Sequence, residues 1–218
     1  PIFSGKPCSM LVSLDGPEEI HNAARPARDT SIEQGLLRGF SVEPAVLTEG
    51  CARRSAPADR QALREEYHAA AVWFVRRARQ GRGPGFFHFT KLIERIVAAR
   101  HMGTECGAGN GYVTVGPDGV LHACHREAGT AVGHVDYGFD EELRAAWADN
   151  RLYAREGCMK CWARYLCGGG CRQACLELAG HLRAIAPERC FLQQTMIREC
   201  LWILTQLTPE EIAKVTPP

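Results

Sequence analysis

The stretch CMKCWARYLCGGGC, residues 158–171, places four cysteines close together with the spacing C-x2-C-x5-C-x3-C. A C-x2-C pair can turn two thiolates towards one metal centre, because two intervening residues are enough to reverse the backbone. The run Gly168–Gly170 permits positive φ angles and close backbone approach, so that amide N–H groups can point at sulfur. We therefore predict that this stretch binds a metal ion or an iron–sulfur cluster through its thiolates.

The composition excludes some classes of protein and indicates the chemical state of the thiols. The chain has 218 residues, eleven cysteines and a formal net charge of +1. This near-neutral charge predicts neither a nucleic-acid nor an anionic-membrane partner, and no apolar run approaches the length of a membrane span. The first residues do not form a signal peptide, so a cytoplasmic location is expected. An odd number of clustered cysteines favours metal-bound thiols, with disulfides and incidental buried thiols as the alternatives.

Periodicity and turn residues predict a mixed α+β chain with a boundary near residue 100. Before it we expect strands at 10–16 and 41–47, a helix over 59–80, and a second helix capped by Thr90. The 59–80 helix takes Asp59 as its N-cap and stops at Gly81. Beyond the boundary, GYVTVGPDGVLHAC (111–124) predicts a β-hairpin around a Gly-Pro-Asp-Gly turn. Further helices are expected after Asp140, over 172–180, from Pro187 to about Leu207, and after Thr208.

The remaining cysteines differ in what their positions predict. Cys106 and Cys124 flank the hairpin, and Cys190 falls in the first turn of the last long helix, where the helix dipole favours a thiolate. Cys200 lies in the apolar stripe of that helix, roughly 15 Å beyond Cys190, and is expected in the core. Cys175 follows Cys171 by one helical turn, which leaves it either as a further ligand or as a buried thiol.

The aromatic residues near the cysteines are weaker indicators of a metal-binding role. Alternation along the strand places His122 on the face of Cys124, so His122 is a better candidate than His125 for a place near a metal centre. A hydrogen-bonded imidazole without a ligand role is the more ordinary interpretation of both. Trp162 and Trp202 are expected to pack in the core.

The full pattern is C-x12-G-x4-C, a gap, C-x2-C-x5-C-x3-C, a gap, then C, and it resembles the SPASM domain of radical S-adenosylmethionine (SAM) peptide-modifying enzymes. The resemblance runs from Cys106 to about Leu204, and CGAGNGYVTVGPDGVLHACHREAG and CWARYLCGGGC look like maturases that install thioether crosslinks or process quinohemoprotein amine dehydrogenase. It implies two auxiliary [4Fe-4S] clusters, one held by Cys106, Cys124 and Cys171 and the other by Cys158, Cys161, Cys167 and Cys190. The first cluster is then one thiol short, and Cys175, a substrate thiol or an open iron site are the alternatives.

The segment VSLDGPEEIHNAARP (12–26) resembles the fourth strand of a radical SAM barrel, where Ser13 and Asp15 would face the cofactor. The C-x3-C-x2-C motif of the SAM-cleaving cluster is absent from this sequence. The chain as given is therefore expected not to cleave SAM, and a gene fragment, a truncation or a degenerate paralogue would each account for this. The expected organisation is a partial barrel remnant with linker helices over 1–100 and a SPASM cluster domain over 101–218.

Three hypotheses about function follow. The first is the C-terminal part of a radical SAM oxidoreductase that matures a ribosomal peptide or protein, with that substrate and an electron donor as partners. The second is a zinc module with Cys158, Cys161, Cys167 and Cys171 around one ion. The third is an inactive scaffold that binds a peptide or a partner enzyme. Under the first two, residues 101–190 should be poorly ordered without metal.

Overall fold

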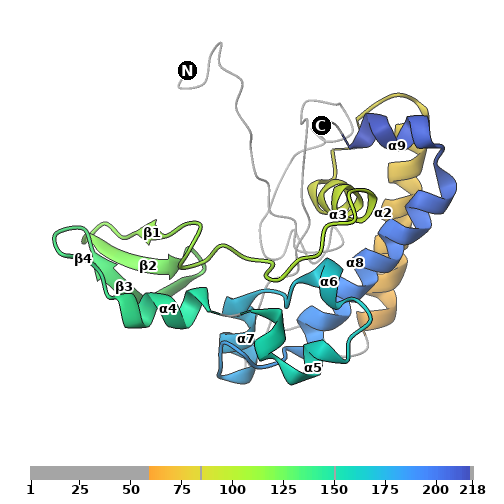
Figure 1. Ribbon diagram of the computed structural model, residues 1–218. Coiled ribbons are helices and arrows are strands. Elements are labelled where there is room, and N and C mark those ends of the chain that lie inside the picture. The colour runs from red at the N-terminus through yellow and green to blue at the C-terminus, as the bar shows by residue number, and fades with distance from the viewer. Residues whose placement is uncertain (1–58, 84, 150, 217–218) are drawn as a thin grey trace, which may run out of the picture. The chain divides into compact units, whose positions relative to one another are not determined.

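The computed structural model describes residues 59–83, 85–149 and 151–216 (Figure 1). The strands expected at 10–16 and 41–47, and with them Ser13 and Asp15, lie outside this part of the chain. The described residues combine helices with one antiparallel sheet, so the chain is α+β as predicted. No helix within them is long and apolar enough to cross a membrane.

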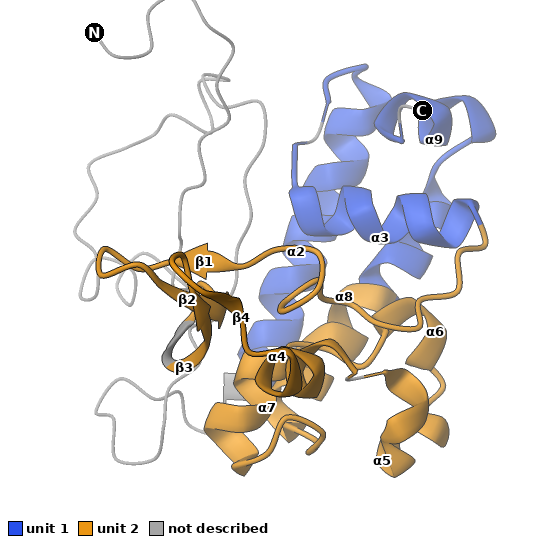
Figure 2. Cartoon of the chain, turned by 60° about the vertical axis from the view of Figure 1, so that its left-hand side comes forward, with its two compact units in different colours: residues 1–45, 55–98, 198–218 blue, residues 46–54, 99–197 orange. Residues whose placement is uncertain are grey.

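The chain divides into two compact units, coloured separately in Figure 2. Among the described residues, unit 1 contains those up to Ala98 together with those from Arg198 onward, and unit 2 contains Ala99–Ile197. Helix α8 (Pro187–Gln206) begins in unit 2 and ends in unit 1.

Unit 1 is built from α2 (Asp59–Arg79), α3 (Phe87–Val97), the second half of α8 and α9 (Pro209–Val215). Its core is aromatic: the Phe86 and Phe89 rings meet edge to face with centroids 4.5 Å apart, and Phe74 lies edge to face with Phe89 at 5.8 Å. Burying each such ring stabilises the fold by roughly 1.5–3 kcal/mol. Cys200 is fully buried in this unit, and its thiol donates to the Phe89 carbonyl oxygen, which confirms its predicted place in the core.

Several predicted ends of helices in unit 1 are confirmed. Gly81 follows α2 with a φ of +67°, and α9 begins with the capping box formed by Thr208 and Glu211. The predicted start of α3 is wrong. Thr90 lies inside that helix and its backbone N–H donates to the Phe86 carbonyl, because burial of Phe86 and Phe89 draws the first turn into the core. Val97, the last residue of α3, is 55% exposed.

Unit 2 contains a four-stranded antiparallel sheet in the order β1-β2-β3-β4. The predicted hairpin is confirmed: β1 (Thr114–Val115) pairs with β2 (Val120–Cys124), and the Gly119 N–H donates to the Gly116 carbonyl in the turn. The strands β3 (Glu127–His134) and β4 (Gly138–Phe139), which extend the sheet, were not predicted.

Helix α4 (Glu141–Ala148) packs on this sheet through Trp147, which is 2% exposed in a cluster with Leu121 and Val132. The Asp140 carboxylate caps α4 by accepting from the N–H groups of Glu142 and Leu143, as its position predicted. Leu143, on the same helix, is 45% exposed.

The cysteine-rich part of unit 2 is a chain of short helices: η1 (Leu152–Ala154), α5 (Glu156–Met159), α6 (Arg164–Cys167) and α7 (Arg172–Ala179). Gly180 ends α7 in the left-handed conformation, as predicted. Trp162 is 50% exposed, so its predicted core role is wrong. Helices of three to eight residues are too short to be stable by themselves, so this region depends on tertiary contacts.

Candidate metal centre

All seven cysteines of the predicted cluster sites lie in unit 2. Each of the nine cysteines in the described ranges is a free thiol, and among them no disulfide pairs are formed. Cys106 lies in the loop before the sheet, Cys124 at the end of β2, and the others along α5–α8 or in the connections between these helices. We call Cys106, Cys124 and Cys171 the first cysteine group, and Cys158, Cys161, Cys167 and Cys190 the second.

Tyr112 joins two members of the first group. Its hydroxyl oxygen is 3.7 Å from the Cys106 Sγ and 3.8 Å from the Cys124 Sγ. Burial and the hydrogen bonds to both thiols raise the pKa of Tyr112 well above its usual value. The phenol therefore keeps its proton and can donate it to a sulfur atom.

Backbone amides also point at these two sulfur atoms. The Ala108 N–H donates to the Cys106 Sγ and the Arg126 N–H to the Cys124 Sγ, both at 3.4 Å. Donors aimed at sulfur stabilise the thiolate form that metals and clusters require.

Arg172 directly follows the third member, Cys171, and contacts residues on either side of Cys106. Its side chain is 2% exposed, and its guanidinium donates to the Ala108 carbonyl at 2.6 Å and to the Thr104 hydroxyl at 2.7 Å. Burial lowers the pKa of Arg172, and the charges of Cys106, Tyr112 and Cys171 act in the opposite direction. The guanidinium is thus an electrostatic neighbour of two first-group thiols and of the tyrosine that bridges Cys106 and Cys124.

The thiols of the second cysteine group also influence one another electrostatically. Burial raises the pKa of Cys190 to about 11, and the nearby thiols of Cys158, Cys175 and Cys161 contribute. Burial likewise raises the pKa of Cys167 to about 12, with Cys190 and Cys158 among its neighbours. The mutual influence of these four cysteines shows that they lie near one another, although they come from three different helices and a connecting loop.

The glycine run acts as its sequence predicts. Gly168, Gly169 and Gly170 all have positive φ angles, and the Gly169 backbone N–H donates to Cys167, which lowers that thiol's pKa against the larger effect of burial. A Cβ at Gly168 would lie 2.7 Å from the Glu105 backbone nitrogen, so only glycine lets this loop pack against the segment before Cys106.

The sequence predicts that the helix dipole favours a thiolate at Cys190. Cys190 does lie in the first turn of α8, but burial raises its pKa instead of lowering it. The dipole offsets only part of the cost of burying a charge.

Cys175 lies on the side of the second group. It is 4% exposed, accepts from the Arg155 guanidinium at 3.4 Å, and raises the pKa of Cys158 and Cys190. Its place beside the second group favours the buried-thiol interpretation over a role as fourth ligand of the first group.

These groupings are looser than a single-ion site. Within the described ranges, no three His, Cys, Asp or Glu side chains could hold one metal ion. Tetrahedral zinc with Zn–S bonds of about 2.3 Å needs its sulfur atoms within about 4 Å of one another, whereas a [4Fe-4S] cluster takes each thiolate at a separate iron and spaces them more widely. Among the described residues, Cys158, Cys161, Cys167 and Cys171 are therefore not gathered around one point as a tetrahedral zinc ion requires.

The preference for His122 over His125 depended on regular alternation along β2. Register shifts on both sides of His122 interrupt the alternation on which that prediction depended. The His125 ring instead lies 6.0 Å from the Tyr112 ring, centroid to centroid. Tyr112, Arg155 and Arg172 were also missed as site residues; the only local signal was that Arg172 directly follows Cys171.

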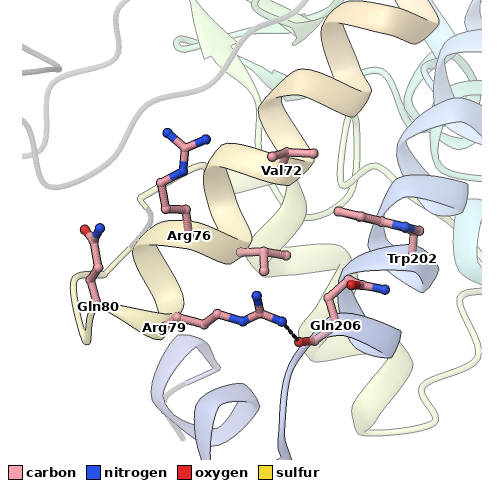
Figure 3. Close-up of a pocket in the computed structure, with 7 residues that line it drawn as sticks. Val72, Arg76, Arg79, Gln80, Trp202 and Gln206 are labelled. Carbon is pink, nitrogen blue, oxygen red and sulfur yellow. Dashed lines mark hydrogen bonds between the residues drawn. The ribbon is translucent and has the colours of Figure 1, made fainter.

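Unit 1 has a hollow of about 480 Å³ between α2 and α8, lined by Val72, Val75, Arg76, Arg79, Gln80, Trp202 and Gln206 (Figure 3). The Arg79 guanidinium donates to the Gln206 carbonyl at 2.7 Å and so ties the two helices together. The lining contains no thiol, imidazole or carboxylate, so we assign the candidate site to the cysteines of unit 2.

No protein-family model and no curated protein matches the chain. The case for function therefore depends on the residues and geometry of unit 2.

Proposed function

We propose that unit 2 binds two [4Fe-4S] clusters, one at each cysteine group, and that the chain is the C-terminal, SPASM-like part of a radical SAM maturase acting on a ribosomal peptide or protein. The observation that supports this proposal is the neighbourhood of the thiols: Tyr112 lies between Cys106 and Cys124, Arg172 is an electrostatic neighbour of Cys106 and Cys171, and the thiols of the second group influence one another. The two groups are those that the resemblance of the sequence implies.

When bound, such clusters supply one-electron transfer or an iron site for a substrate thiol. The residues of this chain hold and orient the thiolates, donate hydrogen bonds to them and limit the access of water. Ser13 and Asp15, which the resemblance places near SAM, would belong to a barrel remnant outside the described residues.

Anaerobic reconstitution of the full chain tests the proposal. Two clusters require about eight iron and eight sulfide per chain, four of each in every cluster. Cys106→Ala and Cys158→Ala should each remove about half of the iron, since each disables a different group. Cys200→Ala is the matched control, because this thiol is buried in unit 1 and should leave the iron content unchanged.

A second candidate is a scaffold that binds a peptide or partner enzyme without SAM chemistry. The observation that favours it is the absence of C-x3-C-x2-C from the sequence. Measurable peptide affinity without SAM cleavage would support this candidate. Bound zinc with no iron after reconstitution would contradict the cluster proposal.

A further inference from the structure

Two buried arginines lie among the cysteines of unit 2. Arg155 is 3% exposed and Arg172 is 2% exposed. Placing a guanidinium in the protein interior is costly unless hydrogen bonds and negative charge compensate for the lost water. The surroundings of these two side chains therefore indicate what the site is built to hold.

Arg155 is fixed beside the second cysteine group. Its guanidinium donates to the carbonyl oxygens of Gly169 and Leu182 and to the Cys175 Sγ. It also donates to Cys158, whose pKa it lowers against the raising effect of burial. The Gly169 carbonyl that orients Arg155 belongs to the same residue whose N–H donates to Cys167.

Arg172 is fixed beside the first cysteine group by the Ala108 carbonyl and the Thr104 hydroxyl, residues on either side of Cys106. Both acceptors are uncharged, so they orient the guanidinium without neutralising it. The thiols of Cys106 and Cys171 are among its electrostatic neighbours.

The two guanidinium groups also lie close enough to repel each other. The charge of Arg155 contributes to lowering the pKa of Arg172, after the larger effect of burial. Two like charges in one interior are unfavourable by themselves, and added negative charge on either side makes the arrangement favourable.

We propose that Arg155 and Arg172 are charge-compensating positioning residues, Arg172 for anionic charge bound at the first cysteine group and Arg155 for anionic charge bound at the second. This inference rests on the proposed function, in which that charge is a thiolate-ligated cluster. One-electron reduction by an external reductant adds one negative charge to the cluster, and a nearby buried cation stabilises the reduced form. Each arginine should therefore raise the reduction potential of the cluster nearer to it.

The test is a redox titration with dithionite on the reconstituted full chain, with each cluster followed by its electron paramagnetic resonance signal. Cys106→Ala and Cys158→Ala identify which signal belongs to which group. We expect Arg172→Gln to shift mainly the first cluster to lower potential and Arg155→Gln mainly the second. The conservative changes Arg172→Lys and Arg155→Lys keep the positive charge, so the reduction potential of the nearer cluster should stay close to that of the wild type.

Arg151→Gln is the matched control, because this arginine is in the same unit but has a 74% exposed side chain, and it should shift neither potential. Unchanged potentials in both glutamine variants with clusters retained, or equal shifts in the control, would overturn the inference. If a glutamine variant loses iron, its lysine counterpart must keep it; equal loss in both also overturns charge compensation. A wild-type chain that binds no iron contradicts the proposed function instead, so the two failures are distinguishable.

Discussion

Tyr112 is the residue whose side chain most directly connects two predicted cluster ligands. Its hydroxyl lies within hydrogen-bonding distance of the sulfur atoms of both Cys106 and Cys124, and burial raises its pKa, which favours the protonated, donating form. The loop places it there through backbone bonds: its N–H donates to the Gly107 carbonyl, and its carbonyl accepts from Gly109.

We expect Tyr112→Phe to leave the fold intact and to weaken the first cluster. Loss of a hydrogen bond to sulfur should cost about 0.5–1.5 kcal/mol, which corresponds to several-fold faster bleaching in air. Absorbance after exposure of the reconstituted chain to oxygen measures this rate. Tyr137→Phe, at a tyrosine that is 78% exposed in the same unit, should bleach like the wild type. Equal bleaching rates for the two variants would show that Tyr112 does not stabilise the first cluster.

The buried thiol of Cys200 makes the free energy of unfolding depend on pH, and substitution of this residue isolates the effect. Burial raises the pKa of its thiol well above the usual value. The folded thiol therefore stays neutral while the unfolded thiol ionises above about pH 8.5. Its stabilising contribution is complete below that pH and is lost as the pH rises, by about 1.4 kcal/mol per unit.

We predict that Cys200→Ala is destabilised by about 1–2 kcal/mol at pH 7, from lost packing. The difference in the free energy of unfolding between the wild type and Cys200→Ala should narrow between pH 8.5 and 10, because only the wild type loses the contribution of this thiol. Denaturant unfolding at a series of pH values measures it. Ile203→Val is the control, because Ile203 is fully buried in the same unit and does not titrate. Its difference from the wild type in the free energy of unfolding should not change with pH. A constant gap for Cys200→Ala would show that its thiol ionises equally well in the folded chain.

At the scale of elements, the loop between Cys106 and Tyr112 is held against α4 by one glycine. Gly109 has a φ of +73°, and a Cβ there would lie 2.7 Å from the Trp147 Cβ. Its N–H donates to the carbonyls of Tyr112 and Ala123, so this residue links the loop, the sheet and the helix.

Gly109→Ala should therefore destabilise unit 2 by about 2–4 kcal/mol, from the left-handed backbone and from overpacking against Trp147. Denaturant unfolding followed by tryptophan fluorescence measures the loss. Gly103→Ala is the control, since a Cβ at that position meets nothing within 4 Å and the backbone needs no positive φ. Similar costs for the two substitutions would contradict the packing argument.

Elements with local signals were predictable, and those without them were not. The Gly-Pro-Asp-Gly turn, the helix end at Gly180 and the helix start after Thr208 each depend on neighbouring residues, and all three are confirmed. The start of α3 and the strands β3 and β4 depend on what packs against them. Thr90 had the chemistry of a cap, but burial of the preceding phenylalanines outweighed it.

For the whole molecule, the proposed function implies that the order of unit 2, which is built from short helices, depends on bound metal. Under the proposed function, cluster binding contributes directly to the folding free energy of this unit. Unit 1 has an aromatic core with no proposed metal ligand, so it should keep its structure when iron is removed.

Chelation of iron from the reconstituted chain should therefore accelerate amide hydrogen exchange at least about ten-fold in β2, β3 and α4–α7, and leave α2 and α3 unchanged. Mass spectrometry of peptides after exchange measures this. A chain carrying both Cys106→Ala and Cys158→Ala, which cannot assemble either complete group, should not respond to the chelator. Equal acceleration in both units would mean that iron stabilises the chain non-specifically.

The amino-acid sequence by itself determined the α+β character, most turns and helix ends, and the cysteine spacing from which the two groups were predicted. Only the tertiary structure placed Tyr112 between two thiols, Cys175 beside the second group, and two arginines inside the cysteine-rich unit. The physical reason is separation along the chain. A turn depends on adjacent residues, whereas Arg172 meets Ala108 and Thr104 from 64 and 68 positions away, and only packing of the whole unit brings such residues together.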